Sequence, residues 1–168
     1  MEGPGGALPR VWTKEVAEGE AKASMEEVLA RASESSSEVL VMDGDMVFGA
    51  DHVVSAHYHA AKATAEGRNA SDSLAMETLL YASGERQLSS AIRKMAVGDG
   101  TRRVVLAVLK GPFGPGEGWS PLASSEGAPD RERLARFGLS EKEMSTVRED
   151  RLQELVLERV AAVDVIKK

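Results

Sequence analysis

The sequence predicts a single α/β domain of the mixed α+β kind, in which a small mixed β-sheet is flanked by several helices. Short runs rich in valine and leucine, typical of buried strands, are interspersed with longer runs whose apolar residues recur every three or four positions. The strong strands are too few for a large doubly wound sheet. A length of 168 residues fits one domain with a substantial core.

The amino-terminal quarter of the chain is predicted to form one helix between short strands. Apolar residues at Met25, Val28, Leu29 and Ala32 are spaced three and four apart, which indicates an amphipathic helix. AspGlyAsp at 43–45 is typical of a turn. In order, the predicted elements are a flexible tail at 1–9, a strand at 10–16, a helix at 21–32, a strand at 38–42, a turn at 43–45 and a short extended piece at 46–48.

A helix of mostly small residues is predicted from Asp51, which can cap it, to about Glu66, with Gly67 ending it. Small residues on one face allow another helix or backbone to approach closely. The apolar face of this predicted helix consists of Val53, Ala56, Ala60 and Ala63.

Residues 74–95 are predicted to form two helices separated by small residues, with Gly84 in the left-handed conformation typical of a helix end. In the second helix, apolar residues at 88, 91, 92 and 95 follow the spacing of one buried stripe. Arg86 and Gln87 stand at its start, where backbone N–H groups lack intrahelical acceptors. Such an end attracts anions, and a guanidinium beside it strengthens the attraction for phosphate. The pattern suggests a contact with nucleic acid.

The carboxyl-terminal half is predicted to begin with the best strand of the chain, at 103–109, followed by a Gly- and Pro-rich, partly mobile surface loop at 111–130. Ser140 and Glu143 match a capping box, with Leu139 and Met144 placed as its hydrophobic staple. A helix is therefore expected to begin at about 141. Its apolar stripe continues after a bend near 150, at Leu152, Leu155, Val156, Val160 and Val163.

The charge of the chain is segregated. The net charge is −6, which argues against a protein that grips nucleic acid over its whole surface. Between residues 84 and 110, however, six basic residues face two acids, a local balance of +4. The absence of cysteine suits a cytoplasmic protein. Neither a signal peptide nor a membrane-spanning run is visible.

No pattern in the sequence indicates catalysis, a cofactor or a metal. Walker loops, dinucleotide fingerprints and nucleophile elbows are all missing. His52, His57 and His59 are spaced by five and two, whereas neighbours on a helix face are three or four apart. We therefore expect a protein that is not an enzyme and that holds neither cofactor nor metal.

Five segments of the chain carry a family resemblance: Val39–His52, His59–Ala63, Arg68–Asn69, Met76–Ile92 and Leu155–Val165. The most specific of them is Met76–Ile92, which contains TyrAlaSerGlyGluArgGln, and its combination with Leu155–Val165 is more specific still. Together these segments resemble the small kinase-binding subunit of the KEOPS complex, a family that includes the TPRKB-type proteins of eukaryotes, and the archaeal members are the most similar.

The resemblance implies a function and a fold. The complex installs a threonylcarbamoyl group on an adenosine of certain tRNAs. The small subunit is not its catalyst: it binds the amino-terminal lobe of a small atypical kinase, stimulates it, and helps to recruit tRNA by holding the single-stranded 3′ CCA end. The threonylcarbamoyl transferase subunit is an indirect partner, and no membrane is involved. The family fold is a small mixed sheet flanked by helices.

Site residues follow from the resemblance and from the chemistry of the side chains. The predicted tRNA-binding residues are Ser83, Gly84, Arg86 and Gln87, within the matching motif, with Lys62 and Lys94 extending the positive patch. Aromatic residues are few, so we expect an apolar pocket involving Ile92 to hold bases. The predicted kinase-binding residues are Leu152, Leu155, Val156, Val163 and Ile166. Part of the stripe at 152–163 must instead pack on the protein's own sheet, and the short apolar end at 163–166 is the part that is harder to bury.

Two other interpretations of the sequence stay open. Arg86 and Gln87 can also form an ordinary solvated helix start with a local salt bridge. The chain as a whole can also be a pure protein-interaction adaptor that regulates the kinase and touches no RNA, which its acidic net charge favours.

Overall fold

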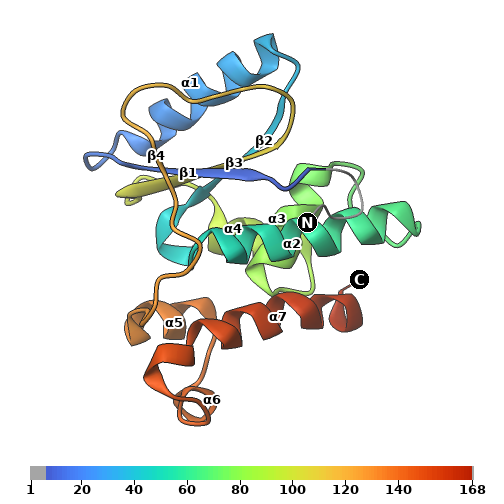
Figure 1. The fold of residues 1–168 in the computed structure, drawn as a ribbon, viewed down its shortest axis with the longest axis vertical. Coiled ribbons are helices and arrows are strands. Elements are labelled where there is room, and N and C mark those ends of the chain that lie inside the picture. The colour runs from blue at the N-terminus through green and yellow to red at the C-terminus, as the bar shows by residue number, and fades with distance from the viewer. Residues whose placement is uncertain (1–6, 168) are drawn as a thin grey trace.

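The computed structural model describes residues 7–167, and a four-stranded sheet forms its centre (Figure 1). All three pairings between neighbouring strands are antiparallel, where a mixed sheet was predicted. The α/β fold class with flanking helices is confirmed. Of the tail predicted at 1–9, residues 1–6 lie outside the described part of the chain. In spatial order the strands are β2 (Glu38–Asp43), β3 (Arg103–Lys110), β1 (Arg10–Glu15) and β4 (Ser120–Pro121).

The strand β3 lies inside the sheet and is covered on both faces. It pairs with β1 on one side and with β2 on the other. Its residues from Val104 to Leu109 are all buried. A strand with two covered faces needs apolar side chains at successive positions and not only at alternate ones. This requirement explains the uninterrupted apolar run that identifies the strand in the sequence.

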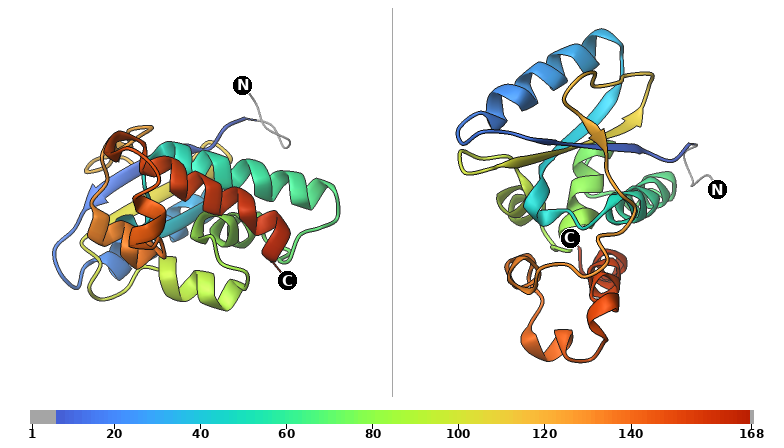
Figure 2. Two further views of the ribbon diagram at one scale, coloured as in Figure 1. Left: turned by 90° about the horizontal axis from the view of Figure 1, so that it is seen from below. Right: turned by 60° about the vertical axis from the view of Figure 1, so that its left-hand side comes forward.

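Helices cover both faces of the sheet (Figures 1 and 2). The helix α1 (Ala21–Glu34) packs on one face, where Val28 and Ala32 join Leu106 and Val108 of β3 in a small core. The other face is covered by α2 (Ala50–Ala65), α3 (Leu74–Ser83) and α4 (Leu88–Met95). The last helix, α7 (Gln153–Ile166), packs against α2 and α3 from outside and forms a further layer.

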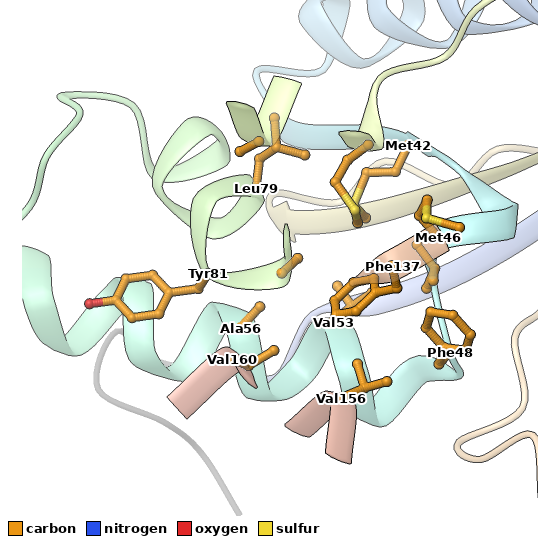
Figure 3. Close-up of a cluster of buried hydrophobic side chains, with 14 of the residues drawn as sticks. Met42, Met46, Phe48, Val53, Ala56, Leu79, Tyr81, Phe137, Val156 and Val160 are labelled. Atoms are coloured by element: carbon orange, nitrogen blue, oxygen red, sulfur yellow. The ribbon is translucent and has the colours of Figure 1, made fainter. Parts of the chain in front are cut away.

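The small-residue face of α2 is what allows α7 to pack closely. Val53, Ala56, Ala60 and Ala63 are fully buried, as predicted. Figure 3 shows Val156 and Val160 of α7 beside Val53 and Ala56 of α2, within one cluster of buried side chains. None of the helices in the described part of the chain is long and apolar enough to span a membrane.

The start of α2 differs from the prediction. Gly49, and not Asp51, is the capping residue, and Asp51 lies in the first turn of the helix. The extended piece expected at 46–48 is confirmed in part, because the backbone of Val47 is extended but Met46 belongs to a 3₁₀ helix, η1 (Gly44–Met46). In this turn the Asp43 side chain accepts a hydrogen bond from the Asp45 N–H. The main chain therefore reaches α2 through a compact turn.

The Gly- and Pro-rich segment 111–130 provides the cap that Asp51 does not. The N–H groups of Ala50 and Asp51 donate to the carbonyls of Ala123 (2.8 Å) and Ser124 (3.0 Å). Gly49 has φ +89°, and a Cβ there would lie 2.4 Å from the Ser124 oxygen, so only glycine fits. The segment also contains the short strand β4. It is thus fastened to both the sheet and α2.

The carboxyl-terminal segment contains one helix that the sequence pattern did not reveal. This helix, α5 (Arg131–Phe137), precedes the predicted capping box. The box itself is confirmed, with both Ser140–Glu143 hydrogen bonds present and with Leu139 and Met144 buried. The helix that it starts, α6 (Glu141–Met144), is only four residues long, and a 3₁₀ helix, η2 (Glu149–Arg151), separates it from α7.

Candidate nucleic-acid interface

The corner between α3 and α4 has the geometry that the sequence predicts. Gly84 adopts the left-handed conformation (φ +71°), and its N–H donates to the Tyr81 carbonyl. The corner is tightly backed, because a Cβ on Gly84 would lie 3.2 Å from the Cβ of Arg159 on α7. Arg86 and Gln87 follow in an exposed position. The helix α4 then begins at Leu88, two residues later than Arg86.

The amino-terminal end of α4 has no side-chain cap. Gln87 is the capping residue in position, but its side chain makes no capping hydrogen bond. The first N–H groups of a helix have no acceptor within the helix. The end of α4 therefore keeps the partial positive charge that attracts anions, and the exposed Arg86 lies two residues before the helix begins.

Ser83 and Lys94, both predicted to bind tRNA, are used inside the protein instead. Ser83 is fully buried, and its hydroxyl donates to the Leu80 carbonyl and accepts from the Glu85 N–H. The Lys94 ammonium donates to the Ser83 carbonyl (2.6 Å) and to Glu85 (3.1 Å), and it lies 3.8 Å from the centre of the Phe137 ring. These contacts brace the corner and leave neither side chain free for RNA.

The surroundings of Lys94 show that its charge is already paired inside the protein. Only 12% of the side chain is exposed. Burial lowers the pKa of Lys94, which the hydrogen bond to Glu85 partly offsets. An ammonium held by a carboxylate and an aromatic face is a structural cation. Lys62, the other lysine predicted to bind tRNA, is exposed near the end of α2.

Two hollows flank α4. The first, which we call the charged hollow, has a volume of about 530 Å³. The second, the apolar hollow, has a volume of about 260 Å³ and opens between α1, β2, α3 and α4. The charged hollow is lined by Asp43, Asp45, Met46, Glu85, Ser90, Arg93, Lys94, Arg136, Phe137 and Gly138. Lys62 lines neither hollow.

Ile92 belongs to the apolar hollow and not to the buried stripe of α4. Its side chain is 41% exposed, whereas Ala91 and Met95 are fully buried. The stripe therefore runs through Leu88, Ala91 and Met95 alone, because Ile92 is turned toward the groove beside Leu29. The predicted apolar pocket that involves Ile92 is present.

The residues predicted to bind the kinase are mostly part of the core. Leu152, Leu155, Val156 and Val163 are buried against α2 and its neighbours, so their side chains are not available to a partner in this structure. Their helical spacing serves the packing of α7 on the protein itself. Only Ile166 (40% exposed), beside Val165 (87%), faces solvent.

Tyr81, at the start of the motif that carries the family resemblance, ties α3 to the end of α7. Its hydroxyl donates to Asp164, which also accepts from Arg68 and contacts His59. Burial raises the pKa of Tyr81, and the neighbouring Asp164 raises it further. Lys167 follows, with its ammonium 2.7 Å from the buried carboxylate of Glu77. The segments Met76–Ile92 and Leu155–Val165, which both carry the family resemblance, are therefore in direct contact through Tyr81 and Asp164.

The three histidines lie in different surroundings. His52 is buried between the Phe48 N–H and the Ala82 carbonyl, and His59 stacks on the Tyr81 ring. Burial lowers the pKa of His57. Within residues 7–167, no group of three or more His, Cys, Asp or Glu side chains is arranged to hold a metal ion.

Comparison with known proteins identifies one family. A family model described as "Kinase binding protein CGI-121" matches residues 16–127, which run from just after β1 to near the end of the 111–130 segment. The match includes the corner, α4 and every residue that lines the apolar hollow. No curated protein matches the sequence.

Proposed function

Because this chain belongs to the CGI-121 family of kinase-binding proteins, we propose that it is a non-catalytic, cytoplasmic subunit of the KEOPS machinery. In this proposal it binds the small atypical kinase of that complex and recruits tRNA through the 3′ CCA end. It thereby supports the threonylcarbamoyl modification of tRNA by the transferase subunit. In this proposal, the corner between α3 and α4 is the part of the chain that contacts the tRNA.

The observation that carries the tRNA part of the proposal is the exposure of Arg86 and Gln87 on a rigid corner. The other polar groups there are already paired, since Ser83, Glu85 and Lys94 bond to one another. Among the described residues, none forms a hydrogen bond or an ion pair with the Arg86 side chain, so the alternative of a local salt bridge finds no support. An unpaired guanidinium on a rigid corner, next to an uncapped helix end, suits a phosphate.

Fewer positive charges are available to bind RNA at the corner than the sequence suggests. Of the six basic residues between 84 and 110, Lys94 is committed to the corner and Arg103 to the Gly44 carbonyl and Glu126. The other four are exposed, but Arg102 and Lys110 lie at the two ends of β3, so that only Arg86 and Arg93 are on α4 and its approach. This small patch suits a short single strand, which needs a few cationic contacts, better than a duplex.

The apolar hollow meets a second requirement for binding a single strand, which is an apolar surface for the bases. Unpaired bases are commonly held by packing on aromatic or apolar surfaces. The hollow lies on one flank of α4 and includes Ile92, Leu29 and Met25. A strand whose phosphates bind at Arg86 can therefore place a base against this surface.

Replacing Arg86 with glutamate is expected to weaken tRNA binding by about tenfold. A hydrogen bond between charged groups contributes about 1.5–3 kcal/mol, and each 1.4 kcal/mol is tenfold in affinity. Fluorescence anisotropy with labelled tRNA in low salt measures the effect. Arg86 is exposed, so the fold should be unaffected, which circular dichroism verifies.

Arg148→Glu provides the matched control, because this arginine is also exposed but lies before η2, outside the corner and both hollows. Its tRNA affinity should stay within about twofold of the wild type. Equal affinities for Arg86→Glu and the wild type would remove Arg86 from the interface.

A pure adaptor that binds the kinase without RNA is the second candidate, and the net charge of −6 favours it. Size-exclusion chromatography with the purified kinase, followed by titration of the complex with tRNA, separates the two functions. Co-elution with the kinase and no RNA binding at any concentration would establish the adaptor.

A further inference from the structure

The chain contains two AspGly pairs, and their surroundings differ. Asp43 and Gly44 lie where β2 ends and η1 begins, whereas Asp99 and Gly100 lie in the loop between α4 and β3. An aspartate followed by glycine is prone to a spontaneous rearrangement of the main chain, because glycine has no Cβ to crowd its backbone nitrogen. The reaction is fast only where the carboxylate and this nitrogen are both free to move.

The rearrangement needs no reagent other than water. The backbone nitrogen of the glycine attacks Cγ of the aspartate, and the new N–Cγ bond closes a succinimide ring. One carboxyl oxygen leaves as water, with the amide proton and one proton taken up from solvent. Water then reopens the ring at either carbonyl. Attack on Cγ restores aspartate, and attack on the main-chain carbonyl carbon gives isoaspartate, in which the chain continues through Cγ and is one carbon longer.

The pair Asp43–Gly44 is protected by its surroundings. The Asp43 carboxylate accepts from the Asp45 N–H (2.9 Å) and from the Thr101 hydroxyl (3.0 Å), which engages both of its oxygens. Gly44 is buried, and a Cβ there would lie 2.8 Å from Nε of Arg103. Ring closure would therefore require both hydrogen bonds to break and a buried, closely packed glycine to move.

The pair Asp99–Gly100 has none of these restraints. The Asp99 side chain is 90% exposed, and within residues 7–167 its carboxylate accepts no hydrogen bond. Its ion pair with Lys22 is 3.4 Å long and exposed, and pairs of this kind are weak. Gly100 is also exposed, and its N–H finds no acceptor in the described part of the chain. Both reacting groups are therefore accessible.

The turn that contains Asp99 also helps to hold Asp43. The Thr101 N–H donates to the Gly98 carbonyl (3.2 Å), and the Gly98 N–H donates to the Thr101 hydroxyl (2.9 Å). These bonds fix the two ends of the turn and leave Asp99 and Gly100 at its tip. Because the same Thr101 hydroxyl donates to Asp43, one turn protects the first pair and exposes the second.

We propose that Asp99 is a site of spontaneous isoaspartate formation and that Asp43 is not. The modification is independent of the proposed function. It lengthens the main chain of the turn between α4 and β3 by one carbon, and it changes the carboxylate that faces Lys22.

The test incubates the folded, full-length chain for days at neutral pH. Endoproteinase Asp-N, which cleaves before aspartate and not before isoaspartate, then maps the product by mass spectrometry. Cleavage before residue 99 should be lost at least about a hundredfold faster than cleavage before residue 43, because two hydrogen bonds to a charged acceptor must break at Asp43 and each corresponds to about tenfold or more. In urea, where neither pair is held, the two rates should become similar.

Gly100→Ala should suppress the loss of cleavage before residue 99, because a Cβ crowds the attacking nitrogen. Gly98→Ala is the matched control, since it makes the same change in the same turn without touching that nitrogen, and it should keep the loss. Neither glycine has a positive φ, and a Cβ on either would meet nothing within 4 Å, so both variants should fold. No loss at residue 99 in the folded chain, or equal rates at residues 99 and 43, would overturn the proposal.

Discussion

Replacing Arg133 with alanine is expected to lower the free energy of unfolding by about 3 kcal/mol, as when one partner of a buried ion pair is removed. The Arg133 guanidinium, in α5, donates to the carbonyls of Asp45 (2.9 Å) and Val47 (3.0 Å) and to the Glu126 carboxylate (3.0 Å). It also lies 4.5 Å from the centre of the Phe48 ring. Alanine would leave these buried acceptors without their donor.

Arg136→Ala is the matched control for this experiment. Arg136 is one turn further along α5, but its side chain is 54% exposed and its contact with Asp45 is 3.6 Å long. An exposed pair of this kind contributes at most about 1 kcal/mol. Urea unfolding followed by circular dichroism measures both variants. A loss for Arg133→Ala no larger than that for Arg136→Ala would show that the network does not hold α5 to η1.

A fall in stability between pH 6.5 and pH 4 is the second large effect that we expect, and His52 is its main source. His52 is fully buried, with Nδ1 accepting from the Phe48 N–H and Nε2 donating to the Ala82 carbonyl. Burial lowers the pKa of His52 to about 4, from 6.5. Since one pH unit corresponds to about 1.4 kcal/mol, the contribution to stability is about 3 kcal/mol.

The direction of the effect follows from proton linkage. Because the folded pKa of His52 lies below the unfolded one, the unfolded chain binds more protons between pH 4 and 6.5. The contribution of His52 is therefore fully present above pH 6.5 and is lost as the pH falls toward 4. Urea unfolding at half-unit steps of pH measures the slope.

His52→Gln tests the assignment of this slope. The variant should be less stable at pH 7, but it should lose much of the decrease in stability between pH 6.5 and 4. His57→Gln should remove a smaller share, because burial also lowers the pKa of His57 but solvent reaches that side chain more readily. A slope for His52→Gln identical to that of the wild type would contradict the assignment.

Local features of the fold were predictable from the sequence because their causes lie within a few residues. The left-handed Gly84, the capping box at Ser140 and the apolar run of β3 each depend on neighbouring positions only. The small-residue face of α2 also predicted that another helix packs closely against it, because small residues allow such an approach. The helix α5 was missed because it is seven residues long and four of them are charged.

Long-range contacts explain the errors at the candidate site. The sequence presents Lys94 as a free surface cation. In the structure its ammonium lies over the ring of Phe137, a residue more than forty positions later in the chain. Asp51 looks like a cap, but the carbonyls of Ala123 and Ser124 take that role. Most of the kinase-binding residues predicted on the apolar stripe of α7 pack against α2 and its neighbours instead. None of these partners is visible from spacing along the chain.

The division of roles along the motif also emerges only from the structure. Tyr81, Ser83 and Lys94 hold the corner in place through buried or half-buried contacts. Arg86 and Gln87, between them, face solvent. A rigid frame around two exposed polar residues is the arrangement that a preorganised binding site requires.

The central claim is that one chain binds both a kinase and the 3′ end of tRNA, and the direct test uses the assembled pair. The kinase–chain complex, isolated by size-exclusion chromatography, is titrated with intact tRNA and with the same tRNA trimmed of its CCA end. We predict one stable complex that binds the intact tRNA at least about tenfold more tightly. A stable complex that binds both tRNAs equally, or neither of them, would contradict the claim.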